Sequence, residues 1–180
     1  MKKKLLSLAL ATMIMSTLAY GTLAYFTSEG RAENKITTGN LEIILHDETT
    51  EGAPFPVDGI SGVMPGDVVD KVVYVENTGG NSSYVRIKLE QKIDSEELSF
   101  ENITLDINEE DWTYQDGWYY YNEALDKGEL TEKLFTKVTF NTDMGNDYMN
   151  AKIEINVIAQ AVQSKNNGDS ALEALGWPKE

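Results

Sequence analysis

Few side chains in this sequence could support catalysis, and His46 is the first to consider. It is the one histidine of the chain, and there is no cysteine. A thiol nucleophile is therefore excluded, and a Ser-His-Asp arrangement would have to use His46 without a Gly-x-Ser-x-Gly elbow. A zinc peptidase usually places two histidines on one helical face, as in His-Glu-x-x-His, and the chain has no such motif. We therefore predict that the protein is not an enzyme and has no catalytic residue.

The other groups that could do chemistry are the 30 Asp and Glu side chains. Asp106, Asn108 and Glu110 are spaced like the start of a calcium-binding loop. However, Asp111 stands where that loop needs glycine, and Gly117 stands where it needs a bidentate glutamate. No two carboxylates are distinguished as a glycosidase pair. We predict no metal ion and no cofactor. We expect the acidic surface to keep the chain soluble and to make copies of it repel one another. The alternative is that the surface loosely binds divalent cations or cationic wall polymers.

Aromatic residues between positions 112 and 121 form a candidate binding surface. The Asp-Gly pair at 116–117 separates two aromatic runs and favours a primed turn, so the sequence predicts a tight hairpin. Its rings could form a platform for a sugar, and the candidate residues are Trp112, Tyr114, Trp118 and Tyr120. The alternative, which we favour, is that half of the rings pack into the core and the others stack across the strands.

Strands are the elements that must position these side chains. Alternating apolar and polar residues predict strands over 40–46, 68–76, 83–92, 103–107, 134–140 and 151–162, besides the two strands of the aromatic hairpin. The Asn- and Gly-rich segment 77–81 predicts that the strands before and after it form a hairpin. About seven or eight strands with almost no helix are typical of one all-β domain, an antiparallel β-sandwich.

Two local expectations complete this fold. In the strand over 83–92, Arg86 alternates with apolar residues, so we expect it on a water-exposed face or in a cross-strand ion pair. Segment 170–176 begins with a residue that can cap a helix and ends with glycine, which predicts a short C-terminal helix of two turns. We expect Trp177 and Pro178, just after it, to fold back on the domain.

The N-terminus has the features of a secretory signal peptide. Lysines at 2–4 precede an uncharged apolar run over 5–19, which is shorter than the roughly 20 residues that a membrane-spanning helix needs. Small-x-small cleavage sites end at Ala19 and at Ala24. We therefore expect export and no stable membrane anchor after cleavage. The chain has 15 Lys and Arg residues and 30 Asp and Glu residues. Because phosphate binding needs clustered cations, we expect no nucleic-acid partner.

Short motifs along nearly the whole chain carry a resemblance to a known family. They are Gly21-Thr22-Leu23-Ala24-Tyr25-Phe26-Thr27-Ser28, Thr38-Gly39-Asn40-Leu41, Met64-Pro65-Gly66-Asp67, Val75-Glu76-Asn77-Thr78-Gly79, Tyr84-Val85-Arg86-Ile87, Asp116-Gly117-Trp118-Tyr119-Tyr120-Tyr121, Thr131-Glu132-Lys133-Leu134-Phe135 and Ala159-Gln160-Ala161-Val162-Gln163. The chain thereby resembles the TasA/camelysin group, exported Gram-positive proteins processed by a SipW-type signal peptidase, and within it the BsaA-type biofilm matrix proteins. Camelysin has been classed as a metallopeptidase, but the chain lacks the motif that such an activity needs.

This resemblance implies the domain organisation and the fold type. It implies a signal peptide over 1–24, cleavage between Ala24 and Tyr25, and a single matrix domain over 25–180 with a flexible N-terminal segment over 25–39. It also implies that the β-sandwich is a jelly-roll variant.

The resemblance further implies an exported structural subunit that assembles into extracellular matrix or biofilm fibres. The freed N-terminal segment would insert as a strand into the sheet of the next subunit, and such a head-to-tail contact yields filaments. The expected partners are other copies of the chain, other matrix proteins and the SipW-type peptidase, and the donor's expected apolar contacts are Tyr25, Phe26, Ile36 and Leu41. The alternative is a monomeric secreted adhesion module that contacts polysaccharide or a surface ligand through the aromatic hairpin.

Overall fold

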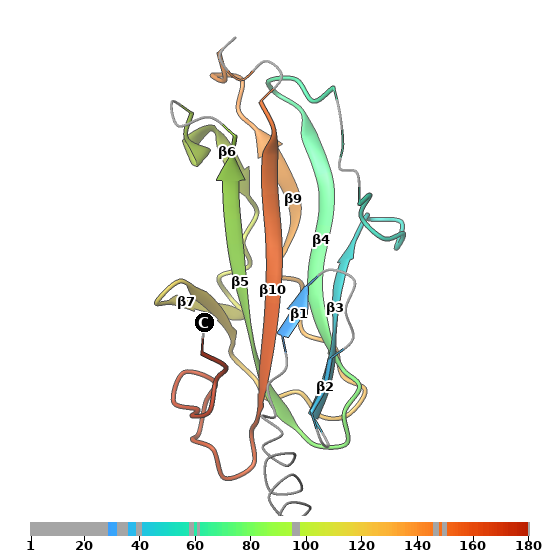
Figure 1. Cartoon of the computed structure of the whole chain (residues 1–180), viewed down its shortest axis with the longest axis vertical. Helices are drawn as coiled ribbons and strands as arrows, with labels where there is room; N and C mark the ends of the chain where they lie inside the picture. The colour runs from blue at the N-terminus through green and yellow to red at the C-terminus, as the bar shows by residue number, and fades with distance from the viewer. Residues whose placement is uncertain are drawn as a thin grey trace, which may run out of the picture.

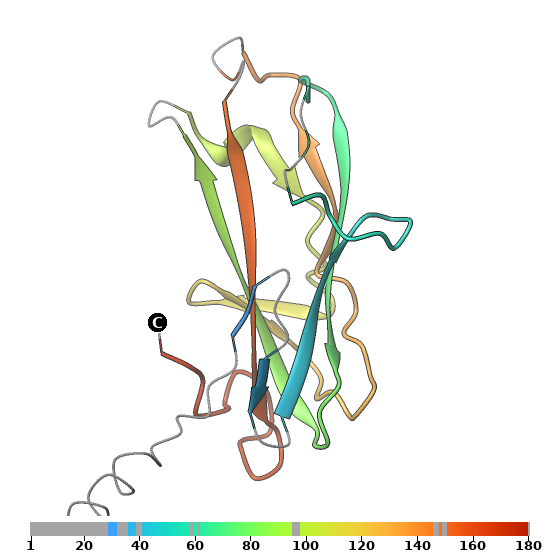
Figure 2. The same cartoon turned by 45° about the vertical axis from the view of Figure 1, so that its right-hand side comes forward.

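The computed structural model describes residues 29–31, 36–38, 41–57, 60, 62–94, 98–145, 148 and 151–179. These residues form two antiparallel sheets packed face to face, which confirms the predicted β-sandwich (Figures 1 and 2). One five-stranded sheet has the order β1-β10-β5-β8-β7, and the other has the order β2-β3-β4-β9-β6. The elements are β1 Glu29–Arg31, β2 Ile36–Thr38, β3 Leu41–Glu48, β4 Val68–Asn77, β5 Ser83–Ile93, the 3-10 turn η1 Phe100–Asn102, β6 Ile103–Leu105, β7 Trp112–Gln115, β8 Trp118–Tyr121, β9 Phe135–Phe140 and β10 Ile153–Gln163.

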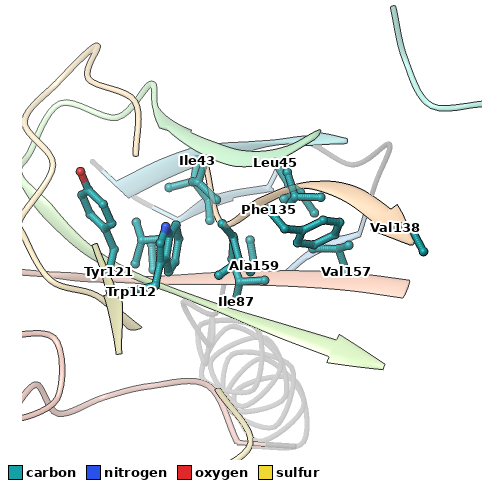
Figure 3. Packing of buried hydrophobic residues seen from close by; sticks show 14 of the residues in the cluster. Ile43, Leu45, Ile87, Trp112, Tyr121, Phe135, Val138, Val157 and Ala159 are labelled. Atoms are coloured by element: carbon teal, nitrogen blue, oxygen red, sulfur yellow. The ribbon is translucent and has the colours of Figure 1, made fainter. Parts of the chain in front are cut away.

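The core lies between the two sheets and is built from alternate residues of their strands. Figure 3 shows side chains from both sheets meeting in this layer. Its fully buried members include Ile43 from β3, Val73 and Val75 from β4, Val85 and Ile87 from β5, Phe135 from β9, and Val157 and Ala159 from β10. A slip of one residue would turn these side chains to the other face of their sheet, so their burial fixes the register of the strands.

The strand pairing has the nested pattern of a jelly roll. β4 pairs with β9, and β5 pairs with β8, so early strands lie beside late ones. This arrangement arises when a long antiparallel hairpin wraps into two sheets. Three pairs depart from it by following the sequence: β2 pairs with β3, β3 pairs with β4, and β7 pairs with β8. The sandwich is therefore jelly-roll-like.

The predicted hairpin across residues 77–81 is wrong. β4 and β5 belong to different sheets, and the segment between them crosses from one sheet to the other. The reason is the side chain of Asn77, which is fully buried. It donates to the carbonyls of Asn81 (2.9 Å) and Leu125 (2.8 Å), and it accepts from the N–H of Gly79 (3.0 Å). These bonds hold a corner instead of a tight turn, and neither Gly79 nor Gly80 has a positive φ.

The predicted C-terminal helix over 170–176 is also wrong, because this segment forms turns. Asn167 binds both backbone groups of Leu175, donating to its carbonyl (3.0 Å) and accepting from its N–H (2.8 Å). Gly168 has a φ of +79°, and a Cβ at this position would lie 3.0 Å from the Cβ of Glu173. The segment is thus folded into a compact loop, which buries Ala171 and Ala174 on the outer face of the first sheet.

Residues 1–28 lie outside the described residues, and with them the predicted signal peptide. Among the residues that are described, no helix is long and apolar enough to cross a membrane. The described parts of the N-terminal segment contribute the short strands β1 and β2, one to an edge of each sheet.

Candidate functional site

The edge of β10 is the first candidate site, because the N-terminal segment of the chain pairs there. On one side, β10 pairs with β5 along its whole length. On the other side it pairs only with β1, through Glu29 opposite Gln160, Gly30 opposite Ala159 and Arg31 opposite Ile158. Within the described residues, no strand covers the rest of this edge. Figure 1 shows β1 beside β10, on the side that faces β3. The N-terminal strand therefore lies along the seam where the two sheets come together.

The expected donor residues fall partly within this region. Ile36 and Leu41 lie in the neighbouring strands β2 and β3, where Ile36 is opposite Ile43 and Thr38 is opposite Leu41. The side chain of Leu41 is half-buried and packs against the core. Ala24, Tyr25 and Phe26 lie outside the described residues, so the cleavage site and the two aromatic donor contacts stay predictions.

The aromatic hairpin forms as predicted, with a primed turn. Asp116 and Gly117 have φ values of 51° and 85°, as a type I′ turn requires. The register places Trp112 opposite Tyr121 and Tyr114 opposite Tyr119. Because side chains alternate along a strand, Trp112 and Tyr114 share one face, while Trp118 and Tyr120 share the other.

The two faces of the hairpin have different surroundings. Trp112 is buried in the main core, where its indole N–H donates to the carbonyl of Glu132 (3.1 Å). Tyr114 is 63% exposed. Trp118 and Tyr120 are buried in a second apolar cluster on the outer face of the sheet, beneath the C-terminal segment. The four candidate platform residues thus divide into two pairs on opposite faces.

Arg86 lies in this second cluster, and the expectation of a water-exposed residue or an ion pair is wrong. Its side chain is 8% exposed. The guanidinium lies against two indole rings, with its carbon 4.0 Å from the ring centre of Trp118 and 4.5 Å from that of Trp177. Its Nε and one Nη donate to Oε1 of Gln160 (3.0 and 2.6 Å), and among the described residues no carboxylate contacts it. We call this arrangement of Arg86, Trp118, Trp177 and Gln160 the arginine cage.

The arginine cage also binds the C-terminal segment. Arg86 donates to the carbonyl of Pro178 (3.3 Å), and the ring of Trp177 packs edge-on against Tyr120. This confirms that Trp177 and Pro178 fold back on the domain. Sequence reasoning missed the burial of Arg86, because in a single strand it has the pattern of a solvent-facing residue. The burial of Arg86 could be inferred only from its pairing with Gln160 on the neighbouring strand. That pairing is known only once the register of the two strands is known.

His46 is held in place by two glutamates. Its Nδ1 lies 2.9 Å from Glu48 and its Nε2 lies 3.1 Å from Glu76, while its ring stacks on Tyr74 at 4.4 Å. Burial, together with the hydrogen bond to Glu48 and the nearby negative charges, raises the pKa of Tyr74. Both ring nitrogens are thus engaged, on opposite sides of the ring, so a single metal ion cannot contact His46 and both glutamates. The cluster links β3 to β4.

The residues that imitate a calcium loop support local structure instead. Asp106 accepts hydrogen bonds from the hydroxyl (2.5 Å) and N–H (2.8 Å) of Thr136 and from the N–H of Lys137 (2.7 Å). Partial burial alone would raise the pKa of Asp106, but these three bonds lower it on balance. Asn108 accepts from the N–H groups of Glu110 and Asp111, both at 3.2 Å. The side-chain oxygen atoms of Asp106 and Asn108 are therefore engaged by donors of the protein itself.

Comparison with protein-family models gives a match over residues 1–110, to the family described as camelysin metallo-endopeptidase. No curated protein and no solved structure matches the chain. The family description implies a metal ion, and the residues that the structure describes do not fit one. Within the described parts of the chain, no three His, Asp or Glu side chains are grouped as metal ligands would be. The single histidine already has a carboxylate on each ring nitrogen.

Proposed function

The chain belongs to the camelysin metallo-endopeptidase family, and from this premise we propose that it is an exported structural subunit of an extracellular matrix or biofilm. Its role is assembly, and it is not an enzyme. The resemblance of its motifs to the TasA group supports the structural role. The engagement of both His46 nitrogens by glutamates speaks against the peptidase activity in the family description, because a zinc peptidase needs open histidine ligands.

The observation that carries the proposal is the edge of β10. A strand edge with unpaired N–H and C=O groups is a template for pairing with another chain. Here a strand of three residues covers part of the edge, and it belongs to the segment that signal-peptide cleavage would free. The edge also borders the core, because Val157, Ala159 and Ala161 of β10 are buried in it. A longer donor strand would therefore gain backbone hydrogen bonds and apolar contacts together.

In the proposed assembly, the N-terminal segment of one subunit pairs with β10 of the next and replaces that subunit's own β1. Backbone hydrogen bonds supply the affinity, and alternate side chains fix the register. The apolar contacts of the donor are Tyr25, Phe26, Ile36 and Leu41. In the monomer, Ile36 and Leu41 pair within their own sheet, so their transfer requires β2 and β3 to separate. Because donor and acceptor are different surfaces, the contact is head-to-tail and the polymer stays open.

The signal peptide over 1–24 is removed between Ala24 and Tyr25 by a SipW-type peptidase, and the mature chain is secreted into the extracellular matrix. Before cleavage, the signal sequence prevents insertion of the donor. The partners are other copies of the chain and other matrix proteins.

A cysteine pair tests strand exchange directly, since the natural chain has no cysteine. Arg31 and Ile158 are opposite residues of β1 and β10, so Arg31→Cys with Ile158→Cys places two thiols across the contact that must open. Oxidation of the monomer should lock β1 in place and prevent fibres, and reduction should restore them. Oxidation after assembly should instead link neighbouring subunits into a ladder on a denaturing gel.

The matched control is Thr104→Cys with Thr139→Cys, opposite residues of β6 and β9 in the other sheet. This pair should cross-link within one subunit before and after assembly, and it should leave fibre growth unchanged. Fibres that grow equally fast from the locked and the reduced Arg31–Ile158 variant would refute strand exchange at β10.

A further inference from the structure

The β7–β8 hairpin projects sideways from the sandwich (Figures 1 and 2). The face of the hairpin that carries Trp112, Tyr114 and Tyr119 borders a hollow. The hollow has a volume of about 350 Å³. Three aromatic residues contribute to its wall, together with residues of the connection that precedes β7. The lining residues are Ile107, Glu109, Trp112, Thr113, Tyr114 and Tyr119.

Two of the aromatic rings that line this hollow lie side by side. Tyr114 and Tyr119 lie on opposite strands with their ring centres 4.8 Å apart and their planes tilted by 47°. Tyr114 is an exposed large aromatic residue, so much of its ring surface faces solvent. Tyr119 is half-buried beside it. Because both residues line the hollow, a ligand bound there would contact two aromatic side chains.

The charge among the side chains that line the hollow is negative. Glu109 is the single charged residue among those that line it, and no cation of the described residues forms an ion pair with its carboxylate. Burial raises the pKa of the Tyr119 hydroxyl, and the nearby Tyr114 and Glu109 raise it further. The faces of aromatic rings are themselves electronegative and attract cations. The ring faces and the Glu109 carboxylate thus both favour a cationic ligand.

We propose that this hollow binds an organic ammonium group, with Glu109 as its counter-ion and the rings of Tyr114 and Tyr119 as its cation–π partners. Aromatic walls with a carboxylate are suited to a cation that is poorly hydrated, such as an alkylated amine, because it loses little solvation on binding. The net charge of −15 also raises the local concentration of cationic ligands. The group can belong to a small quaternary amine or to a lysine side chain of another protein, and the probes below distinguish these two sources.

Ligand-observed saturation-transfer NMR on the mature chain tests this proposal, and it reports binding whether or not the chain has assembled into fibres. The probes are choline, the neutral isostere 3,3-dimethyl-1-butanol, and N-acetyl-lysine methylamide. We expect transfer to at least one of the two cations and none to the neutral isostere. Stronger binding of choline identifies a small quaternary amine as the ligand, and stronger binding of the lysine derivative identifies a protein side chain.

Two substitutions assign the binding to this hollow. Glu109→Gln should weaken binding about three- to tenfold, the range expected for one exposed ion pair with a cation–π contact. Tyr114→Leu should weaken it comparably, and the exposure of Tyr114 makes this change safe for folding. The matched control is Glu110→Gln, which removes the same charge from the adjacent exposed residue and should leave binding unchanged. Equal loss in both glutamine variants, equal transfer to the neutral isostere, or no transfer to either cation would overturn the proposal.

Discussion

Replacement of Arg86 by lysine should destabilise the sandwich although it preserves the positive charge. The guanidinium of Arg86 has planar faces that suit aromatic rings and lies against Trp118 and Trp177, while its N–H groups bind Gln160 and Pro178. A lysine ammonium is a compact point charge without such faces, and it cannot donate to Gln160 and to Pro178 in the same geometry. The change therefore removes contacts from a buried cation without removing the cation itself.

The magnitude follows from the contacts that are lost. Lysine keeps part of each cation–π contact, so each of the two loses about 1 kcal/mol of the roughly 2 kcal/mol that a desolvated contact contributes. The lost charged hydrogen bond costs a similar amount after lysine recovers part of it. We therefore expect a loss of about 3 kcal/mol, which for a domain of this size lowers the melting temperature by roughly 6–12 °C.

Thermal and urea unfolding, followed by circular dichroism, measure this effect. A double-mutant cycle with Trp177→Leu should give a coupling energy of about 1–2 kcal/mol, because the two side chains share one contact. The control is Lys92→Arg, the reverse exchange at an exposed site on β5, which should change stability by less than about 0.5 kcal/mol. If Arg86→Lys behaves like this control, or if the two cage substitutions are additive, the arginine cage does not secure the C-terminal segment.

Two further predictions concern polar groups that hold the strand connections. Asn77→Ala should lower the free energy of unfolding in urea by about 3 kcal/mol. The change leaves the carbonyls of Asn81 and Leu125 and the N–H of Gly79 without their partner. The comparison is Asn122→Ala, at an exposed position. Asp106→Asn should flatten the acid limb of the stability profile. The pKa of Asp106 is lowered in the folded state, so its ionised form stabilises the fold above its unfolded pKa, and this contribution is lost as pH falls through the folded pKa. An unchanged pH profile below pH 4 would contradict the role given to its bonds with Thr136 and Lys137.

Strand positions were predictable from the sequence because one face of each long strand is buried. The alternation over 151–162 corresponds to β10, and the pattern over 134–140 corresponds to β9. The Asp-Gly turn of the aromatic hairpin was predictable for a local reason, since residues with positive φ are required there. In each case the information lies within a few neighbouring residues.

Strand pairing and outer-face burial depend on contacts between residues that are distant in the sequence. Segment 77–81 has the composition of a hairpin turn, but bonds from Asn77 to Leu125 make it a corner between sheets. Arg86 has the pattern of an exposed residue, but Gln160 and Trp177 cover it from the C-terminal part of the chain. The C-terminal helix fails for the same reason, because the side chain of Asn167 takes the backbone groups of Leu175.

The most direct test of strand exchange is electron microscopy of the purified chain from Tyr25 to Glu180, beside the same chain carrying extra residues before Tyr25. A donor strand must enter the seam beside β10 with a free end, so we predict fibres from the chain that begins at Tyr25 and monodisperse particles from the extended one. Fibres from both chains, or from neither, would contradict the assignment of the N-terminus as the donor.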